Sequence, residues 1–315
     1  MNFRTEVHTG RAMLQLHAGD SVCWTGSCFA QHMADRLARY QFEVTAPGHG
    51  ILFHPVAIAR GLTDSLTERE YTEKDLIQDQ GKWHSLAHHG GFSGADQRDV
   101  LNRIRSESAR FRAALLRSDA VLITLGTSRA WKYISTGMIA GNCHKIPGNR
   151  FTADWIDAEE SAGALCRALQ LLHQYNPSIR AVVSVSPVRH WREGAVDNLI
   201  SKSHLILAAH ALCRSLPFVE YFPAYELMMD DLRDYRFYER DMIHPSEAAV
   251  DYIWEKFTGW CMDEEVRATL AQIGKWSRIL AHSPLHDADS HAAAAEKAQA
   301  RISYLLHEAQ KKKPR

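Results

Sequence analysis

The sequence predicts an α/β protein built on an open parallel sheet, and three observations lead to this. Five short apolar runs have the length of strands, at residues 21–24, 42–44, 120–125, 181–185 and 218–222. Segments with apolar residues at helical spacing follow these runs, and strands that alternate with helices are typical of a parallel sheet. The run at 120–125 is almost continuously apolar, as expected for a central strand covered on both faces.

The first half of the chain supplies the first strands and a long polar stretch. A helix is predicted directly after Gly26, because one face carries Phe29, Met33, Leu37 and Tyr40. A second helical segment is expected at 51–59. The polar stretch 63–94 has no strong period, so we expect an excursion over the ligand-binding face that can carry small strands of its own.

The second half repeats the alternation and then changes in character. Helices are predicted at 97–117, around 165–172, at 196–213 and after Pro245, whose ring suits the first turn of a helix. Between the first two of these, 129–157 is expected as a second, loop-rich excursion. Beyond residue 262 only helical patterns remain. We therefore predict a main domain at 1–262 and a helical extension at 263–315, which packs on the body or on a second copy of the chain.

The composition indicates an ordinary globular protein. Of its 315 residues, 37 are Lys or Arg and 37 are Asp or Glu, so no net charge favours a nucleic-acid or membrane partner. The first twenty residues lack the apolar core of a signal peptide, and no stretch is long enough to span a membrane. The six cysteines form no Cys-x-x-Cys pair, which favours reduced thiols and a cytoplasmic location. No dinucleotide or phosphate-binding loop and no regular zinc spacing occurs, so we expect neither a cofactor nor a metal.

Ser27 is the candidate nucleophile because it sits in a turn between the first strand and the first helix. A serine hydroxyl is a poor nucleophile alone, and a sheet edge beside a helix N-terminus is a place where it becomes useful. Gly26 supplies the tight turn. The alternative is that Thr25 or Ser27 simply caps the helix that follows.

Asp241 and His244 form a second candidate constellation after the last strand. Their spacing allows the carboxylate to bond one imidazole nitrogen, which leaves the other nitrogen free to act as a base toward a substrate. The alternative is an ordinary helix entrance with a capping Asp and a solvated His. The presence of a Gly-Ser turn after the first strand favours the catalytic interpretation.

Several segments together resemble the GSCFA family. They begin with the Thr-Gly-Ser-Cys-Phe-Ala of residues 25–30 and continue, between residues 21 and 257, at 50–55, 124–127, 142–145, 185–190, 221–226, 232–238 and 241–245. That family is similar to the SGNH, or GDSL-type, hydrolases. The resemblance implies a three-layer, flavodoxin-like fold with a five-stranded parallel sheet. It also implies Ser27 as nucleophile, His244 as base and Asp241 as the residue that orients the base.

The oxyanion hole is the part where this sequence departs from the wider superfamily. The resemblance implies donors from the Ser27 N–H, a glycine, for which Gly50 or Gly48 qualifies, and an asparagine after the third strand. Ser128 stands at that asparagine position. Ser128, the Thr127 hydroxyl or Asn142 from the next loop are therefore the alternatives for the third donor.

The remaining candidates lie after the fourth strand, where Arg189 and His190 either line the substrate site or hold the aromatic loop that follows. The expected function is a cofactor-free serine esterase that acts on an acyl ester of a small molecule or glycoconjugate. The alternatives are an O-acyltransferase acting on a sugar, because the two excursions can exclude water, and a binding module without catalysis. A homo-oligomer formed through the C-terminal helices is also expected.

Overall fold

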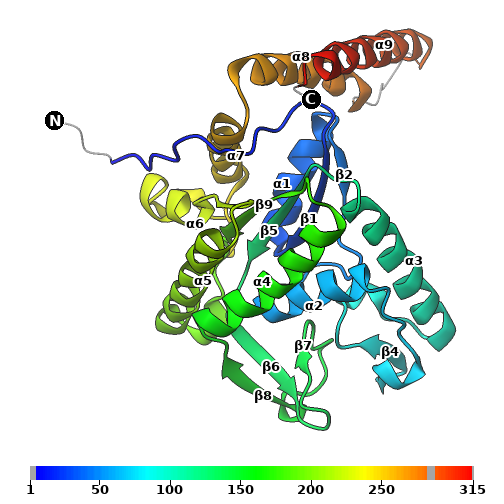
Figure 1. The fold of residues 1–315 in the computed structure, drawn as a ribbon, viewed down its shortest axis with the longest axis vertical. Coiled ribbons are helices and arrows are strands. Elements are labelled where there is room, and N and C mark those ends of the chain that lie inside the picture. The colour runs from blue at the N-terminus through cyan, green and yellow to red at the C-terminus, as the bar shows by residue number, and fades with distance from the viewer. Residues whose placement is uncertain (1–4, 282–287, 314–315) are drawn as a thin grey trace.

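The computed structural model of the chain, shown in Figure 1, describes residues 5–281 and 288–313. Its centre is a parallel five-stranded sheet in the order β10-β9-β5-β1-β2. The strands are β1 (Ser21–Gly26), β2 (Glu43–Thr45), β5 (Ala120–Leu125), β9 (Arg180–Val185) and β10 (Val219–Tyr221). The predicted fold class is confirmed, and each predicted strand lies within two residues of an observed one.

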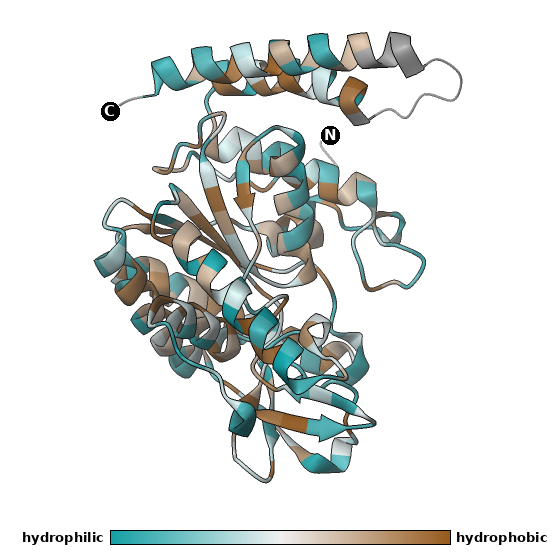
Figure 2. Cartoon of the chain, turned by 90° about the vertical axis from the view of Figure 1, so that its right-hand side faces the viewer, coloured by the Kyte–Doolittle hydropathy of each residue, from teal (hydrophilic) through white to brown (hydrophobic). Residues whose placement is uncertain are grey.

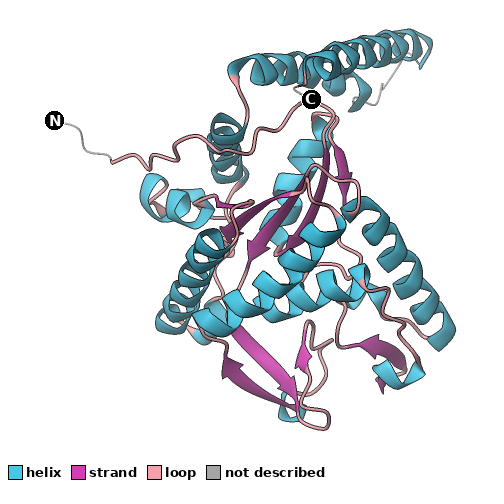
Figure 3. Cartoon of the chain, viewed as in Figure 1, coloured by secondary structure: helices cyan, strands magenta, loops and turns pink. Residues whose placement is uncertain are grey.

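Helices cover both faces of this sheet, as Figure 3 shows. One face carries α1 (Cys28–Arg39) and α7 (Glu247–Cys261). The other carries α2 (Pro55–Leu66), α3 (Gln97–Leu115), α4 (Ala158–Tyr175) and α5 (Ala195–Ser215). Alternate residues of β5 divide between the two layers: Leu122 packs with α1 and α7, whereas Val121 and Ile123 pack with α2 to α5. The result is a three-layer α/β/α core.

Two small antiparallel sheets decorate the core. The excursion at 63–94 begins with the last turn of α2 and then forms the hairpin of β3 (Leu76–Asp79) and β4 (Lys82–Ser85). The small strands expected in this stretch are therefore present. The stretch 129–157 is not loop-rich. It forms a three-stranded sheet, β7-β6-β8, from β6 (Arg129–Tyr133), β7 (Ile139–Ala140) and β8 (Phe151–Trp155). Of its strands, β8 alternates apolar and polar residues as Phe-Thr-Ala-Asp-Trp, which is the period-two signal of a half-buried strand, whereas β6 and β7 do not alternate regularly.

Short helical turns complete the connections. They are α6 (Ala224–Glu226), a π-helical turn at Leu227–Asp231, and 3₁₀ turns at Glu73–Asp75, Gly90–Phe92, Gly148–Arg150, Trp191–Glu193 and Tyr235–Phe237. Most of the aromatic and charged stretch after β10 is thus made of single turns rather than one regular element.

The C-terminal helices α8 (Glu264–Ala281) and α9 (Ala288–Lys312) lie side by side as a separate layer at one end of the molecule (Figure 2). Ile273 and Ile302 are fully buried there and join the core cluster of α1 and α7. Lys313 Nζ bonds Asp20 and Asp119, which precede β1 and β5. These helices therefore cover the amino edge of the sheet, opposite its carboxyl edge. Across the described residues, no helix is long and apolar enough to cross a bilayer.

Candidate active site

The turn after β1 presents Ser27 at the carboxyl edge of the sheet. Gly26 adopts a φ of 121°, and a Cβ at this position would lie 2.1 Å from Thr124 O of the neighbouring strand. Only glycine fits such an approach. The Ser27 N–H then donates to the same Thr124 oxygen, at 3.0 Å, which ties the turn to the end of β5.

Ser27 occupies the N-cap position of α1 but does not cap it. Its backbone is extended, as N-caps are, yet its side chain makes no capping hydrogen bond. Thr25 points elsewhere, because its hydroxyl bonds His49 Nε2 at 3.0 Å. The alternative in which either residue serves as the helix cap is therefore wrong.

The Ser27 hydroxyl is buried and unpartnered. The residue is 1% exposed, and its Oγ makes no hydrogen bond with any described residue. A buried hydroxyl without a partner is unfavourable for stability, and most proteins avoid it. An orphan hydroxyl at the edge where ligands of α/β sheets bind points to a role in chemistry rather than in folding.

Asp241 holds His244 in one orientation. Asp241 Oδ2 lies 2.7 Å from His244 Nδ1, and Oδ1 accepts the backbone N–H groups of Ile243 and His244 at 2.8 and 3.0 Å. The bonds to His244 and Ile243 lower the pKa of the Asp241 carboxyl to about 2. Because an ionised carboxylate only accepts, Nδ1 carries the proton and Nε2 is free to take one.

This pair lies in a loop that ends just before α7, and the prediction that Pro245 lies in the first turn of that helix is wrong. Helix α7 begins at Glu247, and the Ser246 side chain caps it by accepting from Ala249 N. Pro245 precedes that cap and pairs with Tyr238 in an isolated bridge, so it is not in the first helical turn. The side chains of Asp241 and His244 are 45% and 44% exposed, so the imidazole is open to solvent.

Loops from several strands meet around these residues. The Phe53 carbonyl accepts N–H groups of Gly126 and Thr127 after β5, and its ring packs edge-on against His190 at 5.7 Å. Burial, with Lys202 and His244 nearby, lowers the pKa of His190 to about 3. The structure thus gathers the turns after β1, β5 and β9 and the His244 loop at one edge. The bond between Ser27 Oγ and His244 is not formed in this arrangement.

Arg189 fastens the His244 loop to the end of β9. Its N–H donates to Ile243 O at 3.1 Å, and its Nη1 donates to Met242 O at 2.9 Å. The guanidinium lies over Trp191, 3.6 Å from the ring centre, and 5.4 Å from the ring centre of Tyr238. Of the two roles considered for Arg189, this geometry supports holding the aromatic loop.

The residues predicted to form an oxyanion hole have other partners in this structure. Gly50 N donates to Pro47 O, and Ser128 uses both its N–H and its hydroxyl on Ser201 Oγ. Asn142 Oδ1 accepts the N–H of His144 and so belongs to a loop-pinning turn. Their part in an oxyanion hole stays a prediction. It requires the donor bonds of Gly50 or Ser128 to exchange when substrate binds, whereas Asn142 would donate from Nδ2 and can keep its bond to His144.

With this geometry in view, the sequence was compared with known proteins. The sequence pattern of the GSCFA family matches residues 21–257. The chain belongs to the GSCFA family. A comparison with curated proteins found no match.

Two solved structures are similar to this GSCFA protein at low identity. One is a candidate platelet activating factor from Streptococcus pneumoniae, with a TM-score of 0.39 and 13% identity over 76% of this chain and 83% of that one. The other is an acetyl xylan esterase from the rumen bacterium Butyrivibrio proteoclasticus, with a TM-score of 0.35 and 11% identity over 81% of this chain and 64% of that one.

Helix α5 contributes site residues of this GSCFA protein that the sequence analysis missed. Asn198 Oδ1 accepts the His190 N–H at 2.9 Å, and Ser201 Oγ accepts the Ser128 N–H at 2.8 Å. Lys202 Nζ reaches the carbonyls of the turns after β5 and β9. All three are buried polar residues at helical spacing on the inner face of α5, where apolar residues are expected. That departure from the pattern is the signal by which they could have been found.

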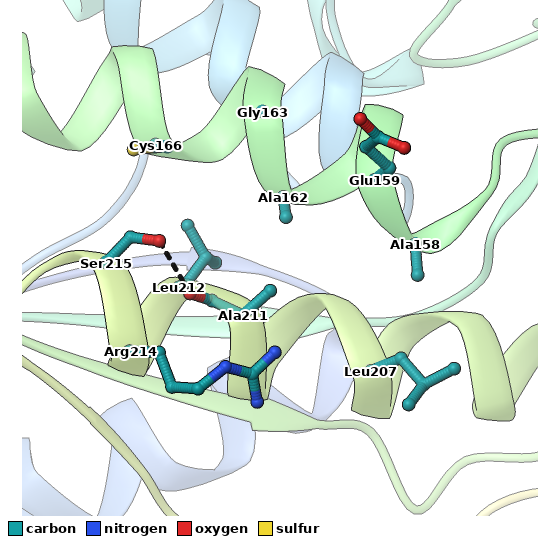
Figure 4. A pocket seen from close by; sticks show the side chains of 10 residues that line it. All are labelled: Ala158, Glu159, Ala162, Gly163, Cys166, Leu207, Ala211, Leu212, Arg214 and Ser215. Carbon is teal, nitrogen blue, oxygen red and sulfur yellow. Dashed lines mark hydrogen bonds between the residues drawn. The ribbon is translucent and has the colours of Figure 1, made fainter.

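Two pockets differ in whether the residues that line them belong to the loops of the candidate site. A pocket of about 270 Å³ lies between the π-helical turn, the segment 232–238 that follows it and the end of β9, lined by Arg189, Met228, Met229, Leu232, Arg233, Asp234, Tyr235 and Tyr238. A second one of about 440 Å³ lies between α4 and α5, where Ala162 stands across from Ala211 (Figure 4). Only the first shares residues with the loops of the GSCFA site, so it is the candidate for binding a substrate.

Proposed function

We propose that this GSCFA protein is a serine hydrolase that cleaves O-acyl esters through an acyl-Ser27 intermediate. The observation that carries the proposal is the unpartnered, buried Ser27 hydroxyl, at the same sheet edge as an imidazole that Asp241 orients. The similarity of the GSCFA motifs to SGNH hydrolases, with serine after the first strand and Asp-x-x-His after the last, supports it.

In this reaction, His244 Nε2 takes the proton of Ser27 Oγ while Oγ attacks the ester carbonyl carbon. The tetrahedral intermediate collapses as the carbon–oxygen bond to the alcohol breaks, and His244 returns the proton to the leaving oxygen. Water then attacks the acyl-Ser27 carbonyl, His244 takes a proton from it, and the carboxylic acid leaves as Ser27 Oγ recovers its proton. Asp241 remains ionised and stabilises the imidazolium that forms in both halves.

The substrate we propose is an acyl ester of a small molecule or glycoconjugate. The pocket beside the His244 loop is lined by Met229, Leu232, Tyr235 and Tyr238, with Arg189 at one side. Apolar and aromatic walls with a few polar groups are typical of small-molecule sites. The structure also leaves the base exposed, so water reaches His244 without displacing a covering element.

The test is labelling of Ser27 by a fluorophosphonate probe, together with release of nitrophenol from nitrophenyl acetate. We expect the wild-type protein to react in both assays and Ser27→Ala in neither, because the probe needs an activated hydroxyl. Ser203→Ala is the matched control, since Ser203 is an exposed serine on α5 that bonds only Leu199 O. Equal reactivity of wild type and Ser27→Ala contradicts the proposal.

Transfer of the acyl group to a sugar is the competing outcome. The same acyl-Ser27 intermediate precedes both reactions, so the decay of the labelled intermediate distinguishes them. A decay rate that is the same with and without acceptor sugars identifies water as the acceptor. A decay that accelerates with one sugar and yields its ester identifies a transferase.

A further inference from the structure

Lys202 is a buried lysine, and charged amines are rare in protein interiors. The residue is 1% exposed, and its Nζ donates to Gly126 O and Ser186 O, each at 2.8 Å. Burial of a charged amine is costly unless it is paired or well hydrogen-bonded. The two acceptors are neutral carbonyls, at the first residues after β5 and β9.

The groups around the amine come from every element packed against it. They are the two carbonyls of the strand ends, the Cys28 thiol at the start of α1, the His190 ring after β9, and the Tyr225 ring of α6, whose centre lies 5.7 Å from Nζ. None of these groups is a carboxylate. Burial therefore lowers the pKa of Lys202 from 10.5 to about 7.

The amine lies beside the Ser27 turn. Ser27 N is bonded to Thr124 O, and Lys202 holds Gly126 O two residues further along the same strand end. The neighbouring Ser201 accepts the N–H of Ser128, in the turn after β5, through its Oγ. One side of α5 thus determines the position of the backbone next to the proposed nucleophile.

We propose that Lys202 is a positioning residue whose ammonium joins the turns after β5 and β9 and keeps a positive charge beside Ser27, so that acylation requires Lys202 to be protonated. This inference rests on the proposed hydrolase function. Negative charge develops on the substrate oxygen as Ser27 attacks, and a preorganised cation in a low-dielectric site stabilises it. The ammonium also occupies two carbonyl oxygens whose partial negative charge would otherwise oppose that oxyanion.

The consequence is a fall in the acylation rate as pH rises through about 7, where Lys202 loses its proton. The other neighbours do not titrate in that range. Burial lowers the pKa of His190 to about 3 and raises that of Tyr225 to about 12. Burial also raises the pKa of the Cys28 thiol above 9.0.

The experiment measures the rate constant for fluorophosphonate labelling of Ser27 between pH 5 and 9. Wild type, Lys202→Arg, Lys202→Met and the control Lys132→Met are compared, Lys132 being a lysine of β6 whose partner is Asp154. We expect the wild-type rate to fall on the alkaline side and Lys202→Arg to lack that fall, because arginine keeps its charge. Lys202→Met is expected to react about tenfold more slowly at pH 6, less than the loss of a direct oxyanion donor.

A stability measurement separates a lost charge from a misfolded variant. Between pH 7 and 10 the unfolded chain binds a proton at Lys202 that the folded chain does not, so wild-type stability rises with pH across this window. Lys202→Met lacks this group, and its thermal midpoint should gain less from pH 7 to 9 than that of wild type. A folded Lys202→Met with the wild-type labelling rate and pH profile overturns the inference and leaves the hydrolase proposal standing. A wild-type protein in which Ser27 is not labelled overturns both.

Discussion

The Ser27 hydroxyl can be removed at little cost to stability. Replacing an N-cap serine by alanine usually costs about 1 kcal/mol because a backbone N–H loses its partner. Ser27 makes no such bond, and its hydroxyl is buried without one. We therefore expect Ser27→Ala to leave the free energy of unfolding within about 0.5 kcal/mol of wild type or to raise it, while it abolishes labelling. Ser246→Ala, which removes a real cap, should cost about 1 kcal/mol in the same urea titration.

In the proposed mechanism, Asp241 acts on the rate through the tautomer of His244. In Asp241→Asn the amide keeps the shape, but its NH₂ can donate to Nδ1, which moves the imidazole proton to Nε2 and removes the base. We expect the labelling rate of Ser27 to fall by up to about 10⁴-fold, the loss known for this exchange in a Ser-His-Asp protease. Asp154→Asn, in an exposed ion pair on β8, is the control. A rate within threefold of wild type would remove Asp241 from the mechanism.

At the scale of elements, the β1–α1 junction depends on one glycine. In Gly26→Ala the new Cβ would lie 2.1 Å from Thr124 O and 2.8 Å from Thr124 N, and backbone of a central strand cannot move aside. We expect a loss of about 3 kcal/mol or more from the clash and the strained φ together. Gly137→Ala isolates the strain, because its φ is also positive, at 70°, but no atom lies within 4 Å. If the two variants unfold at similar urea concentrations, β1 is less constrained than this geometry indicates.

The elements that the sequence patterns predicted correctly are those that bury apolar side chains. β5 is buried on both faces, and its bounds follow directly from residues 120–125. The sheet of β6, β7 and β8 was not predicted because its strands are short and half-exposed. The sequences of β6 and β7 lack a regular alternation of apolar and polar residues, so the stretch was interpreted as a loop. Helix α5 was predicted, but the buried polar residues on its inner face were not. Asn198, Ser201 and Lys202 are buried by contacts to loops far away in sequence, which no local period reveals.

At the scale of the molecule, topology explains why Ser27, Asp241 and His244 could be grouped from the sequence. The carboxyl ends of parallel strands share one edge, so residues after β1 and after β10 lie at the same edge of the sheet, with β5 and β9 between them. The Asp241–His244 bond is local and follows from spacing. The partners of Gly50, Ser128 and Asn142 depend on how separate loops pack, and these the sequence did not predict.

Because α8 and α9 lie at the amino edge of the sheet, we expect substitutions in them to change the stability of the fold without changing the reactivity of Ser27. Ile302 of α9 is fully buried against the core cluster of α1 and α7, so Ile302→Ala should cost about 2–5 kcal/mol of unfolding free energy through lost burial and a cavity. Ser27 lies at the opposite edge, and its labelling rate below the unfolding transition should match wild type. Gln299→Ala, at an exposed position of the same helix, controls for helix propensity.

The same variant also bears on the proposed homo-oligomer, through light scattering of wild type and Ile302→Ala at equal concentration. If the C-terminal helices join two copies, loosening α9 lowers the measured mass. Labelling of Ser27 that declines in step with that mass would show that the carboxyl edge depends on the assembly. Labelling that stays constant while stability falls assigns residues 263–315 to support of the fold, because a layer that buries Ile273 and Ile302 can stabilise β1 and β5 from their amino ends without contacting the residues proposed to react.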